Sequence, residues 1–154
     1  MNPKKEIALH EYVQSEMGKP FKYGTHDCPL FAAGVLDIFA GTSHREELTG
    51  MWHDQKSAWR YLRKNGDIHT NLVNAGCVPV VDSHIQTGDF LCMEQKLAHE
   101  KKWHSVGVCI GSKAAILTEE DGVLTLLMGS RWSSPHNIRR DFTSKLKTFI
   151  ACKV

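Results

Sequence analysis

The chain has 154 residues, of which 42% are apolar and 23% charged. This length and composition predict one globular domain over residues 1–154 and exclude a disordered chain. The 19 Lys and Arg residues against 17 Asp and Glu leave a formal charge of only +2. Because no basic run is longer than a pair such as Lys4-Lys5 or Lys101-Lys102, we expect no nucleic acid as a partner.

The sequence contains no segment that predicts a membrane span or a secretion signal. It has no run of about 18 apolar residues, the length that a transmembrane helix needs. Polar residues interrupt the stretch after Met1, so no signal peptide is expected. We therefore expect synthesis in the cytoplasm and no membrane span.

The cysteines and histidines predict reduced thiols and no metal site. The five cysteines are odd in number and widely spaced, which suits a reducing compartment better than a disulfide framework. Nine histidines occur, but without the CxxC, HExxH or closely spaced His/Cys patterns of zinc sites. We expect neither a metal nor another cofactor.

Helix signals fill the first half of the chain. Asn2 and Gly18 are the expected cap and stop of a helix over residues 3–17. The segment 28–40 is the most apolar part of the sequence and ends at a glycine. This pattern predicts a helix buried at the centre of the domain.

Two further helices and then strands are predicted beyond a polar connection at 42–53. Asp54 is a candidate N-cap for a helix that ends at Asn65-Gly66, and residues 67–75 predict a shorter helix. Apolar or Val-rich segments predict strands at 90–93, 103–110, 114–118, 123–128 and 149–154. Helices followed by strands indicate an α+β domain, with N-terminal helices packed on a mostly antiparallel sheet.

Cys28 is the residue best placed for nucleophilic chemistry. Pro29 follows it, and proline favours the first turn of a helix, so we expect Cys28 at a helix N-terminus. The N–H groups there favour an anion, which predicts a lowered thiol pKa and a place for an oxyanion. The alternative is a cysteine buried as a small hydrophobe. That packing role is the one expected for the other four cysteines, Cys77, Cys92, Cys109 and Cys152.

A nucleophilic cysteine needs a base from elsewhere in the chain. His104 is the best candidate, because it lies near the start of the Val-rich strand predicted at 103–110, where a rigid scaffold could aim an imidazole. His26, two residues before Cys28, is the alternative base.

Four separate motifs occur in chain order: Pro20 to Gly24, His26-Asp27-Cys28 with its apolar helix, Thr87 to Leu91, and His104 to Gly111. Together they resemble the NlpC-type cell-wall peptidases of the papain-like cysteine superfamily. With Leu48 to Trp52 added, the chain is similar to a phage and prophage tail-associated branch of unknown activity. The resemblance covers residues 20–129 and implies a papain-like (NlpC-type) fold.

The resemblance also implies roles for single residues. Cys28 would be the nucleophile, its backbone N–H would belong to the oxyanion hole, and His104 would be the base. The family places this histidine two residues before the strand glycine, whereas His104 lies three residues before Gly107. Because strand side chains alternate, this spacing predicts that His104 turns away from Cys28 unless a bulge restores its direction. The third polar residue, which orients the imidazole, would be Thr118 or Glu119.

The implied function is a cysteine peptidase or amidase that hydrolyses an amide bond of peptidoglycan stem peptides. Its partners would be peptidoglycan or a peptide substrate and phage tail proteins, with the chain carried in the virion tail. The alternative is a catalytically inactive NlpC-like component that serves structure or binding in the tail, since a fold does not guarantee activity. A small acyltransferase using the same Cys/His chemistry is a third hypothesis.

Overall fold

A computed structural model describes residues 2–80, 85–96, 102–128 and 138–140. Within these ranges the helices come first and all the strands follow them. The helices are α1 (Pro3–Glu16), α2 (Cys28–Ala40), α3 (His44–Leu48), α4 (Gln55–Asn65) and α5 (Ile68–Asn74). The strands are β1 (Cys77–Pro79), β2 (Phe90–Lys96), β3 (Lys102–Ile110), β4 (Lys113–Leu117), β5 (Leu124–Met128) and β6 (Ile138–Arg140).

The strands form one sheet in the order β1-β6-β2-β3-β4-β5. Every pair of neighbours in it is antiparallel. The longest ladder joins β2 to β3, and β4 and β5 form a hairpin. The predicted α+β class with an antiparallel sheet is confirmed.

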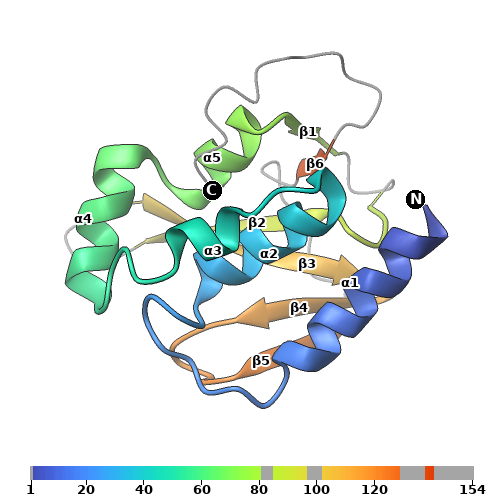
Figure 1. Cartoon of the computed structure of the whole chain (residues 1–154), viewed down its shortest axis with the longest axis horizontal. Coiled ribbons are helices and arrows are strands. Elements are labelled where there is room, and N and C mark those ends of the chain that lie inside the picture. Colours follow the sequence, from blue (N-terminus) through green and yellow to red (C-terminus); the bar gives the residue numbers. More distant parts are fainter. Residues whose placement is uncertain (1, 81–84, 97–101, 129–137, 141–154) are drawn as a thin grey trace.

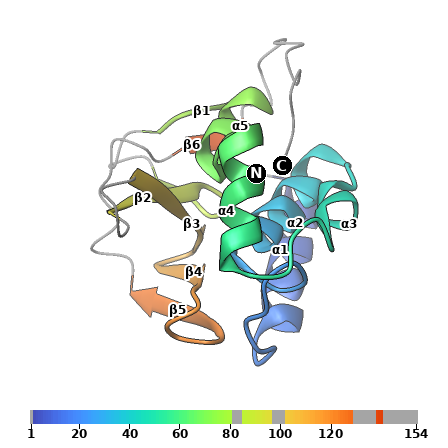
Figure 2. The same cartoon turned by 90° about the vertical axis from the view of Figure 1, so that its left-hand side faces the viewer.

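The helices and the sheet form two layers. Figure 2 shows the strands on one side and α1, α2 and α3 on the other, and Figure 1 shows α2 crossing the middle of the sheet. The apolar side chains of α2 are buried almost all round, as its sequence predicted. They pack with Leu9 and Val13 of α1 on one side and with Val106 and Val108 of β3 on the other. The start of α2 is therefore held at the interface of the two layers.

Local capping signals explain where most helices begin. Asn2 caps α1 through a bond from the Lys4 N–H at 2.8 Å, and Asp54 caps α4 in a reciprocal capping box with Ser57. Gly41 ends α2 in a left-handed conformation at φ +68°. These elements begin and end within one residue of their predicted limits.

Some elements were not predicted. Helix α3 lies inside the connection expected at 42–53, and no side chain of its own caps it. Instead, the carboxylate of Asp37 in α2 accepts hydrogen bonds from the His44 and Arg45 N–H groups. Strands β1 and β6 have three residues each, too few for a periodic signal. The strand predicted at 149–154 lies outside the described residues.

No helix in the described part of the chain is both long enough and apolar enough to cross a membrane.

Candidate functional site

Cys28 is the first residue of α2, as the sequence predicted, and Asp27 caps that helix. One oxygen of the buried Asp27 carboxylate accepts the cap bond from the Leu30 N–H at 3.1 Å. The other oxygen accepts from the Gly24 N–H at 2.8 Å and from the Trp52 Nε1–H at 2.6 Å. These bonds fix the turn before Cys28 against the segment that carries Trp52.

The turn before Cys28 requires glycine at position 24. Gly24 has φ +83°, and a Cβ there would lie 1.9 Å from the carbonyl oxygen of Trp52. The same turn is tied to the β4–β5 hairpin by the Phe21 N–H, which donates to the Gly122 carbonyl at 2.7 Å. Three distant parts of the sequence therefore meet at the start of α2.

The sulfur of Cys28 lies against the backbone of β3. The thiol donates to the Val106 carbonyl at 3.3 Å, and the Val106 N–H donates to the sulfur at 3.4 Å. Strand β4 pairs with β3 only from Val108 to Ile110, so Val106 lies beyond that paired stretch. Cys28 as a whole is half-buried.

The first turn of α2 can bind an oxyanion. Pro29 has no N–H, and the Leu30 N–H is used by Asp27. The Cys28 N–H has no hydrogen-bond partner among the described residues. A carbonyl oxygen that develops negative charge beside the sulfur could therefore accept from it.

The thiol pKa moves in the direction opposite to the one predicted. Burial raises the pKa of the Cys28 thiol to about 12, the Val106 N–H lowers it, and the Asp27 carboxylate raises it further. The predicted position at a helix N-terminus is right, but the predicted lowered pKa is wrong, because packing against β3 removes water from the sulfur. Cys28 is thus a protonated thiol at neutral pH unless a base takes its proton.

A cavity of about 220 Å³ lies beside Cys28. The turn before α2 contributes Tyr23 to its wall, α4 contributes Trp59, and the β4–β5 hairpin contributes Thr118 and Glu119. Both predicted candidates for a third polar residue therefore lie at the same cavity as Cys28. The contribution of α4 was missed by sequence reasoning, and no local signal connects that helix with Cys28.

The two hairpin candidates differ in their partners. The Tyr23 hydroxyl donates to Glu119 Oε2 at 2.5 Å. Burial raises the Tyr23 pKa most, and the Glu119 carboxylate raises it further. The Thr118 hydroxyl donates to Asp121 Oδ2 at 3.1 Å within its own turn. Glu119 is thus held across the cavity wall, whereas Thr118 serves the hairpin turn.

The backbone register of β3 fixes the position of His104. It lies opposite Glu94 of β2, and its side chain lies outside the described part of the structure. The ladder between β2 and β3 continues from position 104 through Val106 to Val108 with no extra residue, so no bulge intervenes.

The faces of β3 can be assigned from its buried residues. Val106 and Val108 belong to the core cluster shared with α2, whereas a Cβ at Gly107 would meet Ile116 of a second cluster. Because alternate strand residues share a face, position 104 shares the face of Val106 and Val108. Gly107 is on the side away from α2, and the direction of the His104 side chain stays a prediction.

His26, the alternative base, lies in a different environment. Its imidazole is buried, and Nδ1 lies 3.0 Å from Glu16 Oε2. Burial lowers the His26 pKa, Glu16 raises it, and the Arg45 and Lys19 charges lower it. His26 does not line the cavity. It belongs instead to a buried polar cluster in which Arg45 Nη1 lies 2.6 Å from Glu16 Oε1.

The other cysteines have the packing positions predicted for them. Cys77, Cys92 and Cys109 are buried in β1, β2 and β3, and Cys152 lies outside the described residues. Burial raises the pKa of Cys109. Among the described residues, no group of three or more His, Cys, Asp or Glu side chains is arranged to hold a metal ion.

Comparisons with known proteins give a family. No curated protein and no solved structure matches the chain. The model of the family described as "Domain of unknown function (DUF6950)" matches residues 2–132, which include Cys28, β3 and every wall of the cavity. The chain belongs to the DUF6950 family.

Proposed function

We propose that this protein is a cysteine peptidase or amidase with a papain-like, NlpC-type arrangement. It would hydrolyse an amide bond of peptidoglycan stem peptides as a component of a phage or prophage tail. One observation carries the proposal: Cys28 begins the central helix beside a cavity, and its sulfur contacts β3 at Val106. Position 104 lies on the same face of that strand, two residues earlier.

In the proposed mechanism His104 takes the proton of the Cys28 thiol, and the sulfur attacks the scissile carbonyl carbon. The Cys28 N–H donates to the oxyanion. The carbonyl re-forms, the C–N bond breaks, and His104 gives its proton to the leaving amine. Water, deprotonated by His104, then attacks the thioester and releases the acid. Glu119 or Thr118 would orient the imidazole.

The raised thiol pKa makes the base indispensable in this proposal. Burial raises the pKa of Cys28 to about 12, so only a minute fraction would be thiolate at pH 7 without a partner. A protonated imidazole beside the sulfur would favour the charged form. The enzyme therefore depends on His104 for its nucleophile as well as for proton transfer.

The same raised pKa favours the second candidate, a catalytically inactive NlpC-like component of a tail. In that case no imidazole reaches the sulfur, and Cys28 reacts with iodoacetamide at pH 7 no faster than a cysteine in a short peptide. Rapid alkylation confined to Cys28, with an apparent pKa well below 9 and slowed by His104→Ala, would contradict the inactive candidate.

Purified sacculi provide the direct test of hydrolysis. Incubation with the protein should release new amino and carboxyl ends, detectable by chromatography and mass spectrometry of the soluble fragments. Cys28→Ala and His104→Ala should each abolish the release while retaining the parent circular dichroism spectrum. Cys109→Ala is the matched control, because that thiol is buried among a different cluster of the sheet, and it should cleave like the parent. Undiminished cleavage by Cys28→Ala would contradict the mechanism.

A further inference from the structure

The charged residues that line the Cys28 cavity are all acidic. They are Asp27, Glu119 and Glu120, and no Lys, Arg or His of the described residues lines it. The Asp27 carboxylate is buried and occupied by three hydrogen bonds. Glu119 and Glu120 are exposed at the hairpin, so they set the charge that an entering group meets. A negative group would be repelled and a positive one attracted.

Aromatic rings form much of the remaining wall. Tyr23, Trp52 and Trp59 line the cavity together with Phe21. The ring of Phe21 meets that of Tyr23 edge to face, with centroids 4.9 Å apart. Ring faces carry partial negative charge, and they attract ammonium and guanidinium groups. Rings combined with carboxylates form a wall suited to a cation with an apolar stem.

The Tyr23–Glu119 bond keeps one carboxylate at this wall. Because the Tyr23 hydroxyl donates to Glu119 Oε2, the second oxygen of Glu119 remains available to another donor. Burial and the neighbouring carboxylate raise the pKa of Tyr23, so its hydroxyl stays a donor at neutral pH. The hydrogen bond therefore orients Glu119 and leaves its charge in place.

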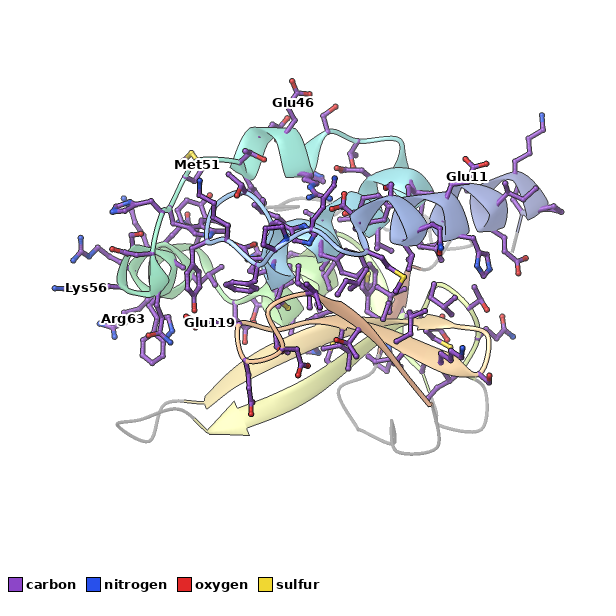
Figure 3. The ribbon with its side chains drawn as sticks, turned by 90° about the horizontal axis from the view of Figure 1, so that it is seen from below. Glu11, Glu46, Met51, Lys56, Arg63 and Glu119 are labelled. Atoms are coloured by element: carbon purple, nitrogen blue, oxygen red, sulfur yellow. The ribbon has the colours of Figure 1, made fainter. Side chains whose placement is uncertain are left out.

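The cationic side chains close in sequence to the cavity residues do not line the cavity, including the exposed Lys22 between Phe21 and Tyr23. On α4, four cationic side chains are exposed, Lys56, Arg60, Arg63 and Lys64. Figure 3 shows Lys56 and Arg63 projecting outward from α4. Because these side chains do not line the cavity, their charges act on its contents from farther away than Glu119 and Glu120 do, and salt screens them more.

We infer that the cavity beside Cys28 binds an ammonium or guanidinium group, with Glu119 and Glu120 as its anionic partners. At about 220 Å³ it would hold roughly seven groups the size of a water molecule, enough for an aminoalkyl chain. Resting on the proposed function, this inference makes the substrate a peptide whose cationic group lies next to the scissile carbonyl.

Charged thiol reagents test the inference without any substrate. Two methanethiosulfonates of similar size are used, one ending in trimethylammonium and one in sulfonate. In each reaction the Cys28 thiolate attacks the sulfenyl sulfur, a mixed disulfide forms, methanesulfinate leaves, and the thiol proton goes to solvent. Both reagents meet the same thiolate fraction, so the ratio of their rates reports the charge of the cavity and not the thiol pKa. Peptide mapping confirms that the label is on Cys28.

The expected ratio can be given as a fold-change. A unit charge about 7 Å away in a water-like medium changes a rate roughly threefold. Because one reagent is accelerated and the other slowed, each carboxylate should change the ratio roughly sevenfold. The parent protein should thus favour the cationic reagent at least tenfold more than N-acetylcysteinamide does. Glu120→Gln and Glu119→Gln should each lower the ratio of the two rates by most of the roughly sevenfold effect of one carboxylate.

Glu46→Gln is the matched control, because Glu46 is exposed on α3 and lies far from Glu119 in Figure 3. It should leave the ratio unchanged. A parent ratio within twofold of N-acetylcysteinamide would overturn the inference, and so would a Glu46→Gln effect as large as that of Glu120→Gln.

The two proposals fail separately. If the protein cleaves sacculi through Cys28 but Cys28 shows no preference between the two charged reagents, the cation site is overturned. The hydrolase proposal is then unaffected. Undiminished cleavage by Cys28→Ala overturns the hydrolase, while a tenfold charge preference would still support the cation site.

Discussion

Asp27→Ala should be among the most destabilising single substitutions in this chain. The carboxylate is buried and accepts bonds from the Leu30 N–H, the Gly24 N–H and Trp52 Nε1–H. Loss of the cap alone costs about 1 kcal/mol. The other two donors would be left buried without a partner, at about 1–3 kcal/mol each. We expect a total loss of about 3–7 kcal/mol in the free energy of unfolding.

Urea unfolding followed by far-ultraviolet circular dichroism measures this loss, and a fall in Tm of roughly 10–20 °C should accompany it. Asp54→Ala is the matched control, because Asp54 also caps a helix, α4, but its exposed carboxylate accepts the Ser57 N–H and otherwise lies 3.4 Å from His53 Nε2. It should lose less than half as much stability as Asp27→Ala. A double-mutant cycle with Trp52→Phe should then show positive coupling to Asp27. Equal losses in Asp27→Ala and Asp54→Ala would refute the reasoning, since the buried donors would then contribute nothing.

Two further predictions concern the helical layer. Gly34→Ala should destabilise the fold by about 1–3 kcal/mol in urea unfolding, because the new Cβ would lie 2.1 Å from the Tyr12 hydroxyl; a stability gain, the usual result of Gly→Ala inside a helix, would contradict that contact. Stability should also fall as the pH drops from 7 to 5. Burial lowers the His26 pKa below its ordinary 6.5, so the unfolded chain binds this proton first. Burial raises the pKa of the Glu16 carboxyl, but the hydrogen bond and charge of Arg45, with the Lys19 and His26 charges, bring it below its ordinary value, so Glu16 should add a further loss at more acidic pH. His26→Gln should flatten the fall between pH 7 and 5, and an unchanged slope of the urea midpoint would count against this assignment.

Features that depend on neighbours in sequence were predictable here. Asn2 and Asp54 bond to N–H groups two and three residues away, so their caps could be predicted from local sequence alone. Helix α3 begins where Asp37 bonds to the His44 and Arg45 N–H groups. No local sequence signal predicts this contact across a turn. Its existence therefore became visible only in the folded chain.

The candidate site divides in the same way. The position of Cys28 at the start of α2 follows from its neighbours Asp27 and Pro29. The direction of its pKa does not, because burial against Val106, 78 residues away, dominates it. His26 was attractive as a base because it is close in sequence, yet its ring lies beside Glu16. The environment of a reactive group is set mainly by distant segments, and these are the part that sequence patterns describe least.

The contact between Cys28 and Val106 has a consequence for synthesis of the chain. The thiol is shielded by a strand made 78 residues later, which at about 5–20 residues per second takes roughly 4–16 s. Until then Cys28 lacks the burial that raises its pKa. A newly made chain therefore presents a more easily oxidised thiol than the finished protein, and completion of the sheet ends that interval.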